Sequence, residues 1–524
     1  MDVHVFRSSF VSYESTASGI CPVIASHLAG RLCYGARYSF PTHSIRTDSS
    51  SRGRRAEIGA LRGNSTKPRR RYSAYARLLL ASTSSLFGGR AALYHNWLLH
   101  LGPAIGFKIE ATQHIAMTYV SKPLFFIHPP KCGGSTVISF FDLNLDRDKF
   151  INFVWGGVSQ EKTRERFLAS GIGGGHDPIG IHRDLKMPLE YCSILREPLS
   201  RQISHYWFAR NGKNGGVARG VSVSEAEALA QGGELSLDDW VGESCSGKNL
   251  FVQMLSGHGR VNRESLALAI ENVRQHIPTV GLCEDMSDFL LRLCGRTGMR
   301  LPFFIRTNVT EGVPKERSPL SERAREKFVE DNHLDYELYQ YVCDEIARER
   351  QSYGAIYTRA IEAVRQIQRR IDALDNPYIY TGKSNMFGFD ENHLRMVREV
   401  ATSADLSPID AYIELAQSRR RECGDLFDGF VDAVNDDMVH GWAVNLSVPD
   451  KCVPIEIWVR EKLVATTLTG NPRPDVAAAG YASERCGFAV RLPEEAQEGF
   501  RVKIAGSAQT IRSAGTWQRG WHMA

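Results

Sequence analysis

The sequence lacks a hydrophobic run long enough to cross a membrane, and its cysteines lack the spacing of a metal site. A transmembrane helix needs about 18–20 consecutive apolar residues. The nearest candidate, residues 78–107, is interrupted by Arg90, His95 and Asn96. The 11 cysteines include no C-x-x-C pair, so they indicate neither zinc nor a disulfide framework. We therefore expect no integral membrane segment, no metal and a reducing, cytoplasmic compartment.

Acidic residues are scarce at the amino-terminal end. Residues 1–116 hold 15 Lys and Arg but 5 Asp and Glu, whereas the remainder of the chain holds 49 and 54. A basic head on a mildly acidic body is not the charge profile of a protein that binds nucleic acid as a whole. Ser, Arg and Gly dominate residues 47–73 without a sustained period. This composition predicts that residues 1–117 form a disordered basic extension.

Three interpretations of this extension stay open. Its many Arg and Ser and few acidic residues are typical of an organelle transit peptide. A basic tail also suits nucleic acid. We favour a third interpretation, in which translation starts at Met117, just before the first predicted strand, so that residues 1–116 are not translated.

A chain of 524 residues is too long for one hydrophobic core and indicates two or three domains. Its most informative stretch is LFFIHPPKCGGSTVISFF, residues 124–141. Residues 124–127 predict a buried parallel strand, Pro129 and Pro130 end it, and the apolar spacing from Val137 onward predicts a helix.

The turn between this strand and helix suits an anion. Gly133 and Gly134 let the backbone approach a ligand closely, and the first-turn N–H groups of a helix favour negative charge. The predicted phosphate-binding loop comprises Lys131, Cys132, Gly133, Gly134, Ser135 and Thr136. It is not a Walker A loop, in which the lysine follows the glycines. We expect Cys132 to be a small loop residue rather than a nucleophile.

A second signal lies about 60 residues further on, in YCSILREPLSRQISHYWF, residues 191–208. The strand-like run 191–195 ends at Arg196 and passes into a helical stretch. Arg196 thus lies at the carboxyl end of a strand, where open α/β sheets bind ligands. Its guanidinium suits a phosphate group, and the hydroxyl of Ser204, eight residues later, suits the same group.

The two motifs resemble those of sulfotransferases, which use 3′-phosphoadenosine-5′-phosphosulfate (PAPS). The loop P-K-C-G-G-S-T is similar to P-K-[TC]-G-G-[TS] of the carbohydrate branch, which includes the heparan sulfate 2-O-sulfotransferases. Residues 196–206 match the 3′-phosphate motif R-[DE]-P-x-x-R-x-x-S-x-[YWF]. The resemblance implies that the loop holds the 5′-phosphosulfate and that Arg196 and Ser204 hold the 3′-phosphate. It also implies an α/β fold with a P-loop-like parallel sheet flanked by helices.

Sulfuryl transfer to a hydroxyl requires a base, and histidine suits that role near neutral pH. His176 follows three glycines, in a G-H segment that supplies the catalytic histidine in the carbohydrate branch. It is therefore the predicted base, and Lys131 is predicted to stabilise the transferring group. His182 is the second candidate for the base, and His128 is expected to be structural. We expect glycines 173–175 to let an acceptor sugar come close.

The resemblance covers residues 118–345, the predicted sulfotransferase domain. Relatives often carry an arginine at about Gln253 or Met254, and its absence here puts that contact in doubt. In relatives a late loop closes over the nucleotide, and Thr307 is the residue of interest there.

The remaining residues follow other patterns. Residues 346–424 are charged with a helical period, which predicts a helical connector. Short alternating strands over 425–524 predict a small antiparallel β-sandwich, which resembles an accessory domain of bacterial glycan-processing enzymes. In it, Trp442 or Trp458 either stacks on sugar rings or, as we favour for both, fills the core.

We therefore predict an enzyme that transfers a sulfuryl group from PAPS to a hydroxyl of a carbohydrate, without a metal. Two alternatives stay open. A nucleotide-dependent small-molecule kinase needs magnesium ligands, usually an aspartate after an apolar strand, and no predicted strand ends so. A non-catalytic glycan-binding protein is disfavoured because Lys131, His176, Arg196 and Ser204 are all present.

Overall fold

The structure is a computed structural model that describes residues 122–145, 150–153, 161–211, 224–306, 320–374, 391–507 and 509–513. The predicted extension 1–117, including Met117, and Thr307 lie outside these residues. Within the described ranges, no helix combines the length and the apolar character needed to cross a membrane.

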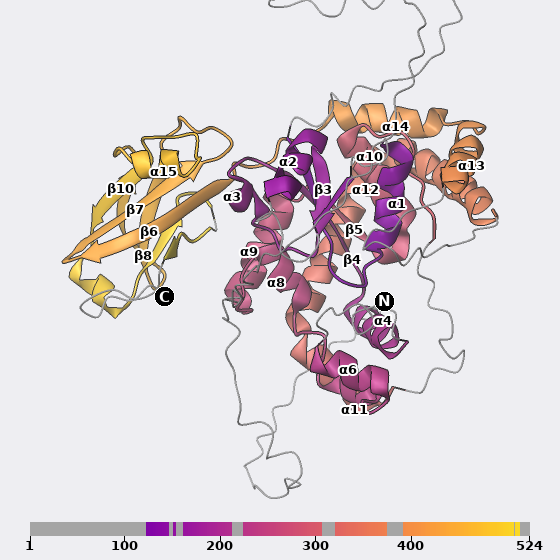
Figure 1. Cartoon of the computed structure of the whole chain (residues 1–524), viewed down its shortest axis with the longest axis horizontal. Helices are drawn as coiled ribbons and strands as arrows, with labels where there is room; N and C mark the ends of the chain where they lie inside the picture. The colour runs from indigo at the N-terminus through magenta and orange to yellow at the C-terminus, as the bar shows by residue number, and fades with distance from the viewer. Residues whose placement is uncertain are drawn as a thin grey trace, which may run out of the picture. The chain divides into compact units, whose positions relative to one another are not determined.

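Among the described residues, five parallel strands form one sheet in the order β2-β3-β1-β4-β5. They are β1 (Leu124–Ile127), β2 (Phe150–Phe153), β3 (Ile172–Gly175), β4 (Glu190–Leu195) and β5 (Thr279–Leu282). Because all strands are parallel, their carboxyl ends meet at one edge of the sheet. Parallel sheets are covered on both faces, and Figure 1 shows helices on both sides of this one. The predicted α/β class is confirmed.

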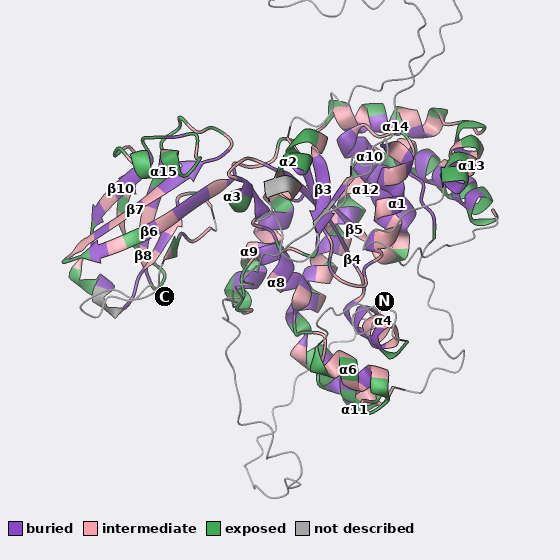
Figure 2. Cartoon of the chain, in the orientation of Figure 1, coloured by how far each residue is buried: buried purple, intermediate pink, exposed green. Residues whose placement is uncertain are grey.

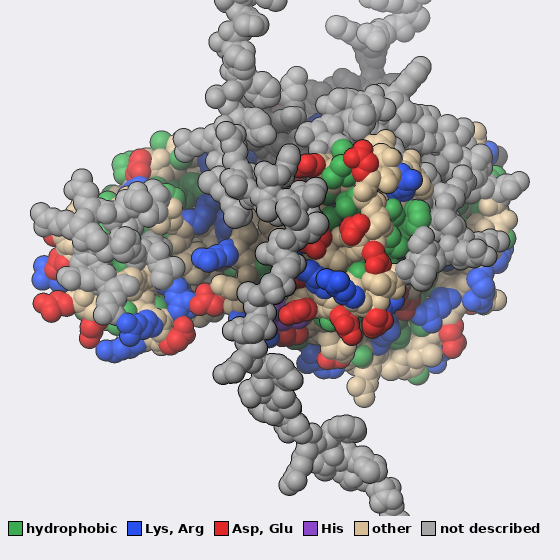
Figure 3. All heavy atoms as spheres, turned by 90° about the horizontal axis from the view of Figure 1, so that it is seen from below, with side chains coloured by type: hydrophobic (Ala, Val, Ile, Leu, Met, Phe, Trp, Pro, Cys, Tyr) green, Lys and Arg blue, Asp and Glu red, His purple; other side chains and the backbone are tan. Residues whose placement is uncertain are grey.

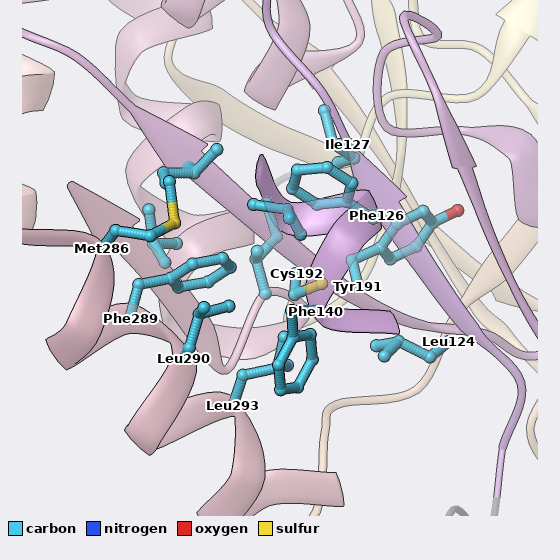
Figure 4. Packing of buried hydrophobic residues seen from close by; sticks show 14 of the residues in the cluster. Leu124, Phe126, Ile127, Phe140, Tyr191, Cys192, Met286, Phe289, Leu290 and Leu293 are labelled. Carbon is cyan, nitrogen blue, oxygen red and sulfur yellow. The ribbon is translucent and has the colours of Figure 1, made fainter. Parts of the chain in front are cut away.

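The first predicted strand and the helix after it form because their apolar side chains share one core. All four residues of β1 are buried. Figure 4 shows Phe126 and Ile127 of β1 in one apolar cluster with Phe140 of α1 (Gly134–Asn144) and Phe289 of α10 (Met286–Thr297). Helix α1 begins at Gly134, three residues before the predicted start, and its N-cap Gly133 adopts a left-handed backbone with φ 81°, which glycine allows.

Glycines 173–175, which we expected to let an acceptor sugar come close, belong to a strand. They form most of β3, and all four residues of that strand are buried. A Cβ on Gly174 would lie 2.5 Å from the carbonyl oxygen of Phe126 in β1. The glycines therefore allow two strands to pack closely, and they do not open space for an acceptor sugar.

Helices make up most of the remaining described residues up to 418. They are α2 (Glu161–Ser170), α3 (Ile181–Leu185), α4 (Pro198–Arg210), α6 (Glu225–Gly232), α7 (Leu237–Gly242), α8 (Leu250–Ser256), α9 (Arg263–Gln275), the short η3 (Cys283–Asp285), α11 (Glu322–Asp331), α12 (His333–Asp372), α13 (Glu391–Thr402) and α14 (Ser407–Ser418). The sheet and the helices beside it are largely buried, whereas α6 and α11 expose many residues (Figure 2).

Helix α12 runs across residue 345, where we predicted the sulfotransferase domain to end. A non-helical residue, Gly354, kinks it. Beyond the kink, Tyr357, Ile361 and Val364 are buried in the same apolar cluster as the strands of the sheet. The helices of residues 346–424 thus contribute to the core around the sheet, and the predicted domain boundary itself stays a prediction.

The carboxyl-terminal residues form two small sheets that share one apolar cluster. One sheet has the order β10-β7-β6-β12 and the other β11-β8-β9. Their elements are β6 (Phe427–Asn435), β7 (Met438–Asn445), β8 (Pro454–Val459), β9 (Lys462–Leu468), α15 (Pro474–Ala478), β10 (Gly487–Arg491), η4 (Glu494–Glu498), β11 (Arg501–Ile504) and β12 (Arg512–Ser513). The pairing of β12 with β6 is parallel, so the first sheet is mixed rather than antiparallel throughout.

The two tryptophans of this region have different surroundings. Trp442 packs against a small cluster that includes Val444 and Val476. Trp458 is half-buried, and its indole Nε1 donates to Glu456 at 2.8 Å. Both tryptophans are half-buried, and the core role that we favoured fits Trp442, which packs against an apolar cluster, better than Trp458. On the face in Figure 3, the acidic and basic side chains of the described residues are interspersed, as on an ordinary solvated surface.

Candidate active site

The predicted site residues gather at the carboxyl edge of the sheet. His176 follows β3, the loop that begins at Lys131 follows β1, and Arg196 follows β4. Glu284, which we did not predict as a site residue, follows β5. These four strands are neighbours in the order β3-β1-β4-β5. His176 and Arg196 thus lie on opposite sides of the β1 loop, although 20 residues of sequence separate them.

The loop has an unusual backbone. Lys131 has φ 70° and Gly133 has φ 81°, both in the left-handed region. Glycine adopts this region freely, whereas a lysine there is strained, and such strain gathers at functional sites. A Cβ on Gly133 would lie 3.0 Å from Cε of Met286 and 3.2 Å from Sγ of Cys283, and a Cβ on Gly134 would overlap the imidazole of His128. Gly133 is therefore favoured by its backbone conformation, and Gly134 by close packing against His128.

The start of α1 suits an anion. Its cap residue Gly133 has no side chain and so cannot cap the positive end of the helix with an oxygen of its own. Lys131, Ser135 and Thr136 are half-buried around it. A phosphate or sulfate oxygen suits this combination of helix terminus, cation and hydroxyl groups.

Cys132 is a small buried loop residue, as we expected. Its thiol is fully buried and lies 3.8 Å from the carbonyl oxygen of Pro130. Burial raises the pKa of this thiol far above the usual cysteine value. The reactive thiolate is therefore suppressed, which disfavours a nucleophilic role.

The second motif owes its form to the start of α4. Glu197 caps this helix, because its carboxylate accepts from the backbone N–H groups of Leu199 at 3.1 Å and Ser200 at 2.7 Å. Pro198 occupies the first turn, where a missing N–H costs nothing. The geometry leaves Arg196 just outside the helix, and its Nη1 donates to the carbonyl oxygen of Lys131 at 3.3 Å. Arg196 is thus hydrogen-bonded directly to the predicted phosphate-binding loop.

Arg201 is a residue whose position sequence reasoning missed. It is 2% exposed, and its Nη2 donates to Gln202 at 2.9 Å and to Ser246 at 2.7 Å. Its buried Nη1 has no hydrogen-bond partner in the described structure. Burial lowers the pKa of Arg201, and Cys132 and Arg196 lie within its electrostatic reach. The motif spacing marked Arg201, but nothing in the sequence indicated that its charge is buried close to the loop.

His176 has a defined tautomer. Its Nδ1 lies 2.6 Å from the carbonyl oxygen of His128. Because a carbonyl oxygen can only accept, Nδ1 carries the proton, and Nε2 of the neutral ring is left as the basic nitrogen. The pKa of His176 lies below the usual histidine value, first because neighbouring groups partly desolvate it and further because Lys131 is positively charged. The ring is therefore neutral near pH 7.

The other two histidines have other surroundings. The ring of His128 stacks on Phe126, with centroids 5.5 Å apart, as expected for a structural residue at a strand end. It also lies beside His176, with centroids 4.5 Å apart. His182 is 2% exposed, and its Nδ1 lies 2.7 Å from the hydroxyl of Tyr191 near the amino end of β4. It therefore lies away from the carboxyl edge and is a poor second candidate for the base.

The site thus combines a helix start without a side-chain cap, a glycine-bearing loop and an arginine at adjoining strand ends. This combination is typical of anion-binding sites in α/β proteins. Two curated proteins are similar to the chain. One is a uronyl 2-sulfotransferase of Mus musculus, 26% identical over 187 residues, which are 31% of this chain and 45% of that protein. The other is the heparan sulfate 2-O-sulfotransferase hst-2 of Caenorhabditis elegans, 32% identical over 113 residues, 20% of this chain and 33% of that protein.

These similarities confirm the predicted resemblance to a 2-O-sulfotransferase-like carbohydrate sulfotransferase branch. The chain spans less than half the length of either relative. No family model matches the chain. No solved structure matches it either.

Proposed function

We propose that this chain is a sulfotransferase that moves the sulfuryl group of PAPS to a hydroxyl of a carbohydrate. The observation that carries the proposal is the arrangement of His176 and Arg196 on either side of the β1 loop. In this arrangement His176 would act on the carbohydrate hydroxyl from one side of the loop. Arg196 would bind the phosphate of the donor on the other side, so that the two substrates meet at the loop. The names of the two relatives make the 2-hydroxyl of a uronyl residue the first acceptor to test.

The residues of the site fit the donor. Arg196 and Ser204, both half-buried, would hold its 3′-phosphate. The loop from Lys131 to Thr136 and the uncapped start of α1 would hold the phosphosulfate, in a P-loop-like manner. When bound, PAPS supplies the sulfuryl group and a good leaving group.

The side chains of the chain supply the rest of the chemistry. Nε2 of His176 accepts the proton of the acceptor hydroxyl while the new S–O bond forms and the bond to the donor phosphate breaks. The hydrogen bond from Nδ1–H to His128 holds the ring in the tautomer that this step needs. Lys131 and the start of α1 stabilise the negative charge that develops on the transferred group and on the leaving phosphate.

A ligand-stabilisation experiment tests the proposal. We expect 3′,5′-adenosine bisphosphate to raise the melting temperature without magnesium. At 100 times its Kd, the bisphosphate should increase the free energy of unfolding by about 2.7 kcal/mol. Stabilisation by ATP that requires magnesium, with none from the bisphosphate, would support the kinase alternative instead. Binding of glycans without any nucleotide effect would support the non-catalytic alternative.

A further inference from the structure

The ammonium group of Lys131 lies over an aromatic ring. Its Nζ is 3.6 Å from the centroid of Phe208, a half-buried residue of α4. A cation within about 6 Å of a ring centroid is attracted by the negative face of the ring. Phe208 lies outside the phosphate motifs that we predicted from the sequence, so no role was assigned to it.

The register of α4 explains how Phe208 reaches the loop. Arg201, Ser204 and Phe208 follow one another at spacings of three and four residues, so they share one face of the helix. Arg201 is buried within electrostatic reach of Cys132. This face of α4 therefore covers the phosphate-binding loop, and Phe208 lies one turn beyond Ser204 on it.

Lys131 is consequently held at two points by one segment of chain. Its carbonyl oxygen accepts from Nη1 of Arg196 at 3.3 Å, just before α4 begins, and its ammonium group contacts Phe208 near the end of α4. Between these points the backbone of Lys131 keeps the strained φ of 70°. A strained residue persists only where its surroundings determine its conformation, and these two contacts act on both ends of the residue.

We propose that Phe208 is a positioning residue that holds the ammonium group of Lys131 in place over the phosphate-binding loop. Arg196 lies just before α4, and Ser204 and Phe208 lie in it. A movement of this segment would therefore shift the residues assigned to the 3′-phosphate together with the residue that orients Lys131. The inference rests on the proposed function for the identity of the nucleotide, and on the structure alone for the contact.

Three variants and one double-mutant cycle test this role. Phe208→Leu removes the ring but keeps an apolar side chain, and it should weaken binding of 3′,5′-adenosine bisphosphate about two- to thirtyfold, the range that cation–π strengths span. Phe208→Tyr keeps the ring and should bind within about twofold of wild type. Trp207→Leu is the matched control, since Trp207 is a neighbouring aromatic on α4 that packs against the separate cluster around Trp240. It should not change nucleotide affinity.

The cycle separates positioning from structural support. In a Lys131→Met background, Phe208→Leu should cause no further loss of affinity, because the group that it holds is gone. An equal loss in both backgrounds, or the same loss in Trp207→Leu, would overturn the inference. So would a gain of affinity in Phe208→Leu, which would show that the ring withholds Lys131 from the ligand. Failure of the wild-type protein to bind the bisphosphate would instead refute the proposed function.

Discussion

Replacing His176 should separate proton transfer from nucleotide binding. A positioned general base is worth about 10²–10⁴-fold in rate, so His176→Ala and His176→Gln should lower kcat by that factor. Nucleotide affinity should stay within about twofold of wild type, because β3 carries His176 on the far side of β1 from Arg196. Arg196→Ala should do the opposite, since a lost charge-assisted hydrogen bond of about 1.5–3 kcal/mol weakens binding roughly ten- to hundredfold.

The pH dependence of kcat/KM, which reports the ionisation of the free enzyme, gives an independent check. Under the proposed function the base must be neutral His176, and its pKa is lowered from the usual value of 6.5, first by desolvation. The midpoint of the acid decline in kcat/KM should therefore lie below pH 6.5. Calorimetry with 3′,5′-adenosine bisphosphate measures the nucleotide affinity. Sulfate transfer to uronate-containing glycans measures the turnover. The reasoning is refuted if His176→Ala retains more than about a tenth of wild-type turnover, or if its nucleotide affinity falls as far as its rate.

Three further outcomes are expected. Gly134→Ala should lower the free energy of unfolding in urea by about 1–3 kcal/mol, because its Cβ would overlap His128. The control Gly259→Ala, whose Cβ would meet no atom within 4 Å, should lower it by less than about 0.5 kcal/mol. Cys132 should resist iodoacetamide in the folded protein, as followed by mass spectrometry, and rapid labelling would contradict its burial. Burial holds the pKa of His182 well below 6.5, so the unfolded state takes up its proton first and stability falls as the pH drops below about 6.5. His182→Gln should show a shallower acid loss of melting temperature, and an unchanged slope would exclude His182 as a cause.

The strands that carry the site could be predicted because their signals are local. β1 and β4 are short apolar runs that end at proline or at a charged residue, and each passes into a helix with a recognisable start. Glycines 173–175 misled the prediction because a glycine strand lacks the side chains that mark a strand in sequence. What makes it a strand is its pairing with β1, where Gly174 meets the backbone of Phe126. That contact is visible only in three dimensions.

Some residues of the candidate site could likewise be predicted from the sequence, and others could not. Lys131, His176 and Arg196 could be placed from motif spacing, because each directly follows a strand of a parallel sheet. The burial of Arg201 and the contact of Phe208 with Lys131 could not be predicted, since both depend on which face of α4 covers the loop. His182 was a reasonable second base by sequence distance, but the turn after β3 carries it to the opposite end of the sheet.

The order of the strands has a consequence for engineering. Under the proposed function, the base His176 lies in the connection after β3. Arg196 and Ser204, which would bind the nucleotide, lie in the connection after β4, and β1 is between the two strands. The residues that would recognise the donor and the residue that would act on the acceptor therefore belong to different connecting segments of the chain. Exchange of the segment that follows β3 for that of a related enzyme should redirect the acceptor choice while α4 and its nucleotide contacts remain untouched.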